Sequence, residues 1–217
     1  MATPTPSPSP EQPVRLVPRP QEPAAGPLSG DPAMVAFPSF VVGAVALGMV
    51  LIGVVPATAV GASMPIILAA AAGMFLATIW AARIGQNAAA GISGVVGGFF
   101  LSYALLVLGL THNWYAIPLT ATTDTQKVFV ISWIVIVTML VRAGLRLPTI
   151  FLALSLLVDI SLVLDLLGIV QSSANLTKAS GWALMAVAAL VVYLFVGSAS
   201  RATGGKELPM GPPILHA

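Results

Sequence analysis

The amino-acid sequence predicts an all-α integral membrane protein, a six-transmembrane-helix bundle that follows a disordered proline-rich N-terminal tail. Hydrophobic residues make up 58% of the 217 residues and charged residues only 7%, a composition far from that of a soluble domain. Six apolar runs of about 20 residues, the length that crosses a bilayer, fill residues 34–198. Each run must be helical, because hydrocarbon offers no hydrogen-bond partner to a free backbone N–H or C=O.

Composition divides the chain into three parts. Prolines recur throughout residues 1–33, and because proline has no N–H to donate, such a segment favours solvated polyproline II or disorder. We predict a disordered cytoplasmic tail at 1–33, a six-helix domain at 34–198 and a short cytoplasmic tail at 199–217. The N-terminal tail contains no apolar core of signal-peptide length, so we expect it to be retained. It is a solubilising extension or a segment that binds a partner, and both interpretations stay open.

The apolar runs place the predicted helices in order along the chain. We expect them at residues 37–55, 64–82, 87–110, 127–145, 149–169 and 179–198. Proline is tolerated at helix boundaries, and it stands at or near them at Pro56, Pro65, Pro118 and Pro148. Only a few residues separate the second helix from the third and the fourth from the fifth. Each of these pairs is therefore predicted to be antiparallel neighbours.

The basic residues predict how the helices are oriented. One side of the predicted membrane receives most of them: Arg15, Arg19, Arg83, Arg142, Arg146, Arg201 and Lys206. The other side receives only Lys127 and Lys178. Because cytoplasmic loops carry the excess of Lys and Arg, we expect both termini in the cytoplasm. The chain is thus predicted to be a multi-pass protein of the plasma membrane.

Asp159 is the candidate proton-handling residue, because it lies near the bilayer midplane, about ten residues into the fifth predicted helix. An ionised carboxylate at that depth costs at least ~2.5–3.5 kcal/mol, and no predicted helix has a Lys or Arg at matching depth. We therefore expect a neutral acid or a water-lined position. Proton or substrate handling and a hydrogen-bonded structural role both stay open. Asp165 lies near the outer end, about 120° around the helix from Asp159, and we expect it to be structural.

The sequence argues against an enzyme. Ser93, within Gly91-Ile92-Ser93-Gly94, would need a base to act as a nucleophile, yet His112 lies in a predicted loop and His216 in the tail. The chain has no cysteine, no metal-ligand spacing and no phosphate-binding loop. We therefore expect no metal and no cofactor, and the net charge of +2 indicates no nucleic-acid partner.

Gly91, Gly94 and Gly97 repeat every three residues and so lie along one stripe of the third predicted helix. Missing side chains let helix backbones approach closely within a membrane. The stripe is therefore a close helix contact or, alternatively, the wall of a narrow path for a small solute.

Several ordered segments resemble one family. Asp31-Pro32-Ala33-Met34-Val35-Ala36-Phe37-Pro38-Ser39-Phe40 is similar to the opening motif Asn-Pro-Ala-Pro-Leu-Gly-Leu-x-Gly-Phe of the acetate uptake transporters, the acetate–succinate permeases. Four residues of this motif are candidate site residues: Asp31, Pro32, Ala33 and Ser39. Further matches follow in order at Gly85, Gly97, Phe99, Trp133, Ser155-Leu156, Gly181-Trp182, Tyr193-Leu194 and Leu208-Pro209-Met210-Gly211.

The resemblance implies a six-helix protomer, usually assembled into a hexamer, with a path for small monocarboxylates through each protomer. Family members pinch that path with an aromatic residue, a tyrosine and a leucine, which correspond to Phe40, Val96 and Leu156 in this sequence. Because Val96 replaces the tyrosine, we expect a wider and drier constriction. The implied function is uptake of a small monocarboxylate such as acetate. We expect this uptake to be coupled to protons, with Asp159, which stands where the family pattern is apolar, as the titratable group.

Two alternatives stay open. The family's glutamine and glutamate positions in the second helix are Met74 and Ala81 here, which would suit a membrane scaffold that no longer transports. An ammonium or anion channel on the same fold is the other alternative.

Overall fold

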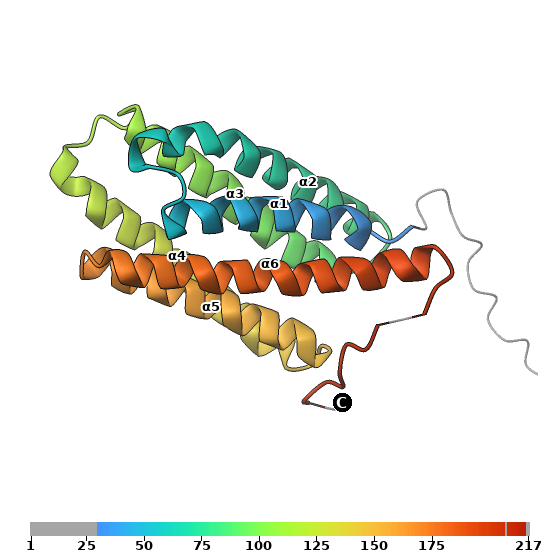
Figure 1. The fold of residues 1–217 in the computed structure, drawn as a ribbon. Coiled ribbons are helices and arrows are strands. Elements are labelled where there is room, and N and C mark those ends of the chain that lie inside the picture. The colour runs from blue at the N-terminus through green and yellow to red at the C-terminus, as the bar shows by residue number, and fades with distance from the viewer. Residues whose placement is uncertain (1–29, 207, 216–217) are drawn as a thin grey trace, which may run out of the picture.

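The computed structural model describes residues 30–206 and 208–215, and the prediction for the N-terminal tail lies almost entirely outside them. The elements are α1 (Ala33–Ile52), η1 (Ala57–Ser63), α2 (Met64–Arg83), α3 (Asn87–Thr111), η2 (Leu119–Ala121), α4 (Thr122–Gly144), α5 (Thr149–Val170) and α6 (Ala174–Ala202). Each of the six α-helices is long and apolar enough to cross a membrane. The described residues form no strand. The predicted fold class is confirmed (Figure 1).

Several helix boundaries differ from the prediction, among them the start of α4 at Thr122 rather than residue 127. The first helix begins four residues earlier than predicted and carries Pro38 inside it. It ends at Ile52 because Gly53 adopts the left-handed conformation, with φ of 89°, and donates its N–H to the last turn. The sixth helix begins at Ala174 rather than residue 179, because a polar, exposed first turn extends beyond the apolar run.

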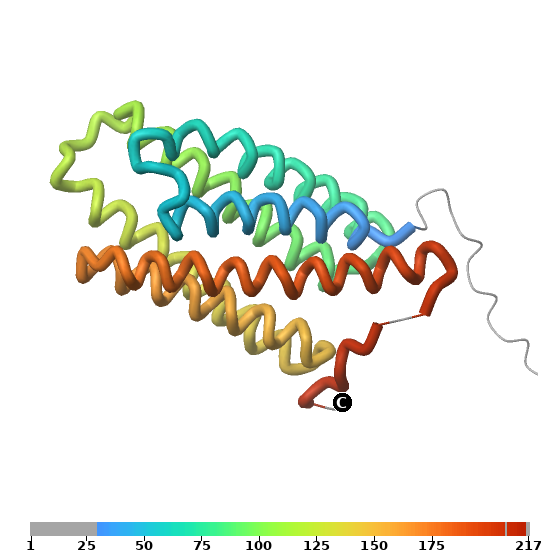
Figure 2. The backbone as a smooth tube through the Cα atoms, viewed as in Figure 1, coloured from blue at the N-terminus to red at the C-terminus, as the bar shows by residue number. Residues whose placement is uncertain are grey.

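The helices alternate in direction and form a ring in chain order. Helix α1 packs closely on α2 and α6, α2 on α3, α4 on α5, and α5 on α6. Helices α3 and α4 make far fewer backbone contacts, so they form a seam in the ring. The start of α1, the end of α6 and the short turns α2–α3 and α4–α5 lie together at one end of the bundle (Figure 2). We call this end the termini end, and the opposite one the loop end.

Glycines allow α1 and α6 to approach each other. A Cβ atom on Gly181 would come within 2.8 Å of the backbone nitrogen of Ile52 and within 2.9 Å of the carbonyl oxygen of Gly48. Close backbone approach of this kind is how helices associate where lipid removes the hydrophobic driving force. The α1–α6 contact therefore depends on a missing side chain.

Of the three glycines in the α3 stripe, two lie in a helix contact and one lies on a cavity wall. A Cβ atom on Gly97 would lie 3.2 Å from Met74 and Phe75 of α2, and one on Gly94 would lie 3.4 Å from Thr78. These two glycines face α2 and support packing. Gly91 has no atom within 4 Å of such a Cβ and lies on a cavity wall.

The C-terminal segment 208–215 folds back across the termini end. The hydroxyl of Tyr193 in α6 donates to the Pro209 carbonyl at 2.8 Å, and the N–H of Ile150 in α5 donates to the Met210 carbonyl at 3.2 Å. The N–H of Leu215 donates to the Leu145 carbonyl at 3.0 Å. The segment is thus docked on both α5 and α6.

We expect Tyr193→Phe to loosen this docked segment. The lost hydrogen bond contributes about 0.5–1 kcal/mol, which corresponds to a two- to fivefold rise in the undocked population. Trypsin cleavage after Lys206, followed by mass spectrometry, should accelerate by that factor. Tyr115→Phe is the matched control, because the Tyr115 hydroxyl donates to the Leu105 carbonyl at the loop end. Equal cleavage rates in wild type and Tyr193→Phe would contradict the prediction.

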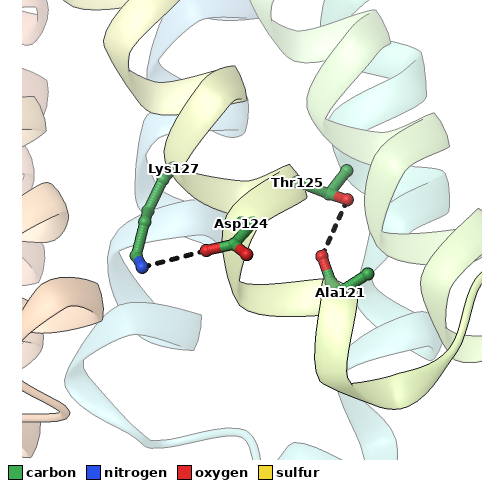
Figure 3. A network of polar contacts seen from close by, with 4 residues as sticks. All are labelled: Ala121, Asp124, Thr125 and Lys127. Carbon is green, nitrogen blue, oxygen red and sulfur yellow. Dashed lines mark hydrogen bonds and ion pairs between the residues drawn. The ribbon is translucent and has the colours of Figure 1, made fainter.

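At the loop end, the start of α4 holds an ion pair. The Lys127 ammonium lies 3.0 Å from a carboxylate oxygen of Asp124, one turn away (Figure 3). Thr125 in the same turn donates to the Ala121 carbonyl at 3.0 Å. One of the two basic residues predicted for the outer side is therefore compensated by a carboxylate.

Candidate functional site

A cavity of about 420 Å³ lies inside the ring, and residues from all six helices line it. Its wall is mostly apolar. The polar side chains on that wall are Asn87, Ser93, Tyr103, Trp133, Ser155, Ser161, Asp165 and Ser180. We call this space the central cavity. A mostly apolar wall with a few polar groups is typical of small-molecule sites.

Aromatic side chains close the seam between α3 and α4. Phe99 of α3 meets Trp133 of α4 edge to face, with ring centroids 5.4 Å apart, and it also contacts Phe129 at 5.9 Å. Tyr103, one turn along α3, contacts Phe129 at 6.1 Å. Large rings thus span a gap that the backbones leave open. The sequence predicted neither this cluster nor its role, although Phe99 and Trp133 both belong to the segments that resemble the family.

The three residues predicted to form the constriction do not all meet. Phe40 and Val96 line the central cavity, and Phe40 contacts Phe100 with ring centroids 5.9 Å apart. Leu156 does not line it, and 42% of that side chain is exposed on the outside of the protomer. Its neighbours Leu154 and Ser155 line the cavity instead.

The two aspartates of α5 lie on different faces, as their spacing predicts, but the inward one is Asp165. Asp159 lies outside the cavity lining, where the Thr138 hydroxyl of α4 donates to its two carboxylate oxygens at 3.2 and 3.3 Å. Asp165 is on the cavity wall. Ser161, four residues earlier and therefore on the same face, is on that wall too. This polar spacing is the signal in the sequence that would have identified Asp165.

The opening motif surrounds a second cavity of about 220 Å³ at the termini end. Asp31, Pro32 and Ala33 line it, together with Arg201 of α6 and Met210 of the C-terminal segment. An Asp31 carboxylate oxygen accepts from the Ala33 N–H at 2.9 Å, and the other lies 3.9 Å from the Arg201 guanidinium. We call this space the vestibule.

Ser39, the remaining motif residue, does not line either cavity. Its hydroxyl donates to the Val35 carbonyl at 2.8 Å, and its side chain packs where a Cβ atom on Gly73 of α2 would lie. The structure therefore places Ser39 in a helix contact.

The vestibule and the central cavity share a wall. Six residues line both spaces: Ala36, Phe37, Ile92, Ser93, Phe151 and Leu194. They come from α1, α3, α5 and α6. Both spaces reach the termini end, because the central cavity is also lined by Asn87 at the start of α3 and by Leu147 in the α4–α5 turn. We call the six shared residues the septum. The sequence did not indicate a second constriction.

The described residues contain no group of three or more His, Cys, Asp or Glu side chains that could hold a metal ion. Ser93 lines both cavities, and His112 lies in the loop after α3, stacked on Trp114. The central cavity therefore offers an apolar space with several hydroxyls and one carboxyl group on its wall.

These features define a membrane-spanning helical bundle with cavities along its axis. The chain belongs to the GPR1/FUN34/yaaH family, whose family model matches residues 15–204, and the resemblance to the acetate uptake transporters is thereby confirmed. The fold is similar to that of the bacterial acetate channel SatP, with a TM-score of 0.73 and 16% identity over 84% of this chain and 99% of that chain. A search of curated proteins gave no match.

Proposed function

We propose that this protein carries acetate or a similarly small monocarboxylate across the membrane, together with a proton, through the vestibule and the central cavity of each protomer. The observation that carries the proposal is the extent of the central cavity, which residues of all six helices line from Leu147 at the termini end to Asp165 near the loop end. Membership of the family and the likeness to an acetate channel support it. Symport of a proton avoids moving a bare anion against a negative interior, which costs ~2.3 kcal/mol per 100 mV.

The constriction that we propose contains two residues predicted from the sequence and two identified from the structure. Phe40 and Val96 narrow the central cavity, and the septum residues Phe37 and Phe151 narrow the passage to the vestibule. Leu156 faces outward in a single protomer. We propose that it lies against a neighbouring protomer in a hexamer, which cross-linking in native membranes would test.

The orientation follows the positive-inside rule. Arg83, Arg142, Arg146 and Arg201 belong to the termini end, so this end faces the cytoplasm of the cell that holds the protein in its plasma membrane. The vestibule is then the inner mouth. Protease protection of tags placed at either terminus would test this orientation.

Uptake of labelled acetate by proteoliposomes tests the proposed function. Vesicles that contain the protein should accumulate label faster than protein-free vesicles, which report diffusion of the neutral acid through lipid. Imposing a pH gradient, acidic outside, should increase the initial rate, and a protonophore should remove that increase. Uptake equal to that of protein-free vesicles under both conditions would contradict the proposal.

An ammonium channel is the second candidate, because Asp165 places a carboxyl group in an aromatic-lined cavity. Ring faces and a carboxylate both attract cations. Labelled methylammonium in the same vesicles decides between the two: faster methylammonium than acetate entry would favour the cation channel.

A further inference from the structure

The carboxyl group of Asp165 has an unusual position for a side chain five residues from the end of a membrane helix. It is part of the central cavity wall rather than turned toward the loop end. Within the described residues, Asp165 is not part of any ion pair or side-chain hydrogen bond. Asp159, by contrast, has a hydroxyl partner on α4. The two aspartates on α5 therefore differ in their access to a solute.

The groups around Asp165 set its chemistry. Among the described residues of the central cavity wall, Asp165 and Tyr103 are the titratable side chains. Tyr103 of α3 and Asp165 of α5 line the same cavity. Helix α4 presents Phe129 and Trp133 to the cavity, and α6 presents Ser180 and apolar side chains. Lys178 of α6 instead approaches Gly53 at the end of α1.

This arrangement makes the cavity's affinity for a carboxylate depend on one proton. An ionised Asp165 repels a second carboxylate in an apolar cavity, because such a medium screens charges poorly. A protonated Asp165 instead has an O–H to donate, and the Tyr103 hydroxyl is a second donor. When Asp165 is protonated, Asp165 and Tyr103 can therefore bind a carboxylate together. When Asp165 is ionised, its charge repels that carboxylate.

We propose that Asp165, with Tyr103 as its partner, is the proton-binding group of this protein and forms the outer recognition site for a short monocarboxylate. The O–H of Asp165 hydrogen-bonds to the carboxylate, and the proton passes to it, so that a neutral acid moves on and Asp165 is left ionised. A proton from the outer solution then restores the acid. One proton accompanies each carboxylate. This inference rests on the proposed function and names the residue that couples the two.

Equilibrium exchange of labelled acetate in proteoliposomes, at equal pH and acetate on both sides, tests the coupling. Between about pH 6 and pH 8 a simple carboxylic acid is already ionised, so a wild-type rate limited by one proton should fall by up to tenfold per pH unit. Asp165→Asn should exchange at a rate that stays nearly constant over this range. Asp159→Asn is the matched control on the same helix and should keep the wild-type profile.

Two further variants separate coupling from structure. Asp165→Glu keeps a titratable group and should restore the pH dependence that Asp165→Asn loses. Tyr103→Phe should raise the acetate concentration for half-maximal exchange severalfold while leaving the pH profile in place. A wild-type pH profile in Asp165→Asn would overturn the inference, as would loss of the profile in Asp159→Asn alone.

Infrared difference spectra of the reconstituted protein keep this test independent of transport. A protonated-carboxyl band that titrates with pH should be present in wild type and in Asp159→Asn and absent in Asp165→Asn. If wild type moved no acetate yet showed this band, the proposed substrate would fail while Asp165 remained the proton-binding group. A band that survives in Asp165→Asn would overturn the assignment.

Discussion

Replacing Ala36 with tryptophan should stop transport. Ala36 belongs to the septum and lines both the vestibule and the central cavity. An indole at this position enters the passage between two spaces whose walls are already packed side chains. Because the indole would occupy space that a solute needs in both cavities, acetate exchange in proteoliposomes should fall by about tenfold or more, which corresponds to a barrier higher by about 1.4 kcal/mol.

Val42→Trp is the matched control. Val42 lies on the same helix, but 47% of its side chain is exposed on the outside of the bundle. This variant should exchange acetate at close to the wild-type rate. Both variants should elute from size exclusion in detergent as wild type does, which separates a blocked passage from a failure to fold. Wild-type exchange by a well-folded Ala36→Trp protein would show that the solute does not cross the septum.

Gly181→Ala should reduce stability more than its single added methyl group suggests. The new Cβ would lie 2.8 Å from the Ile52 nitrogen and 2.9 Å from the Gly48 oxygen. Both are backbone atoms, so α1 and α6 must separate. Overpacking of this kind costs about 1–3 kcal/mol. The temperature at which the monodisperse peak is lost in detergent should therefore fall by several degrees.

Gly91→Ala provides the comparison, because no atom lies within 4 Å of the Cβ that it adds. Alanine also favours the helix more than glycine does. We expect unchanged or slightly higher thermal stability. If both alanine variants lost stability equally, the close α1–α6 contact could not be the cause.

The local sequence was sufficient to predict the six long helices. Helix α3 begins at the predicted residue 87, and α5 begins at the predicted residue 149. The boundaries that differ are those where capping decides the outcome, as at Gly53, or where a polar turn extends a helix beyond its apolar run, as at Ala174. Hydropathy detects the part of a helix that meets lipid and does not detect its polar extensions.

Packing contacts between helices determined which residues line the central cavity. Leu156 and Ser155 are adjacent in sequence, yet only Ser155 lines the central cavity. The sequence fixes the angle between Asp159 and Asp165, but it does not set how α5 is rotated about its own axis. Packing against α4 and α6 sets that rotation, and so it decides which carboxyl group a solute can meet.

By itself, the sequence determined that six helices cross the membrane in alternating directions, because the free energy of burying an apolar run in lipid depends on consecutive residues. It also carried the family resemblance. Only the tertiary structure decided that Asp165 rather than Asp159 lies on the cavity wall, that aromatic rings close the α3–α4 seam, and that a septum separates two cavities. Each of these depends on the rotation and spacing of whole helices, which arise from contacts between residues far apart in the chain.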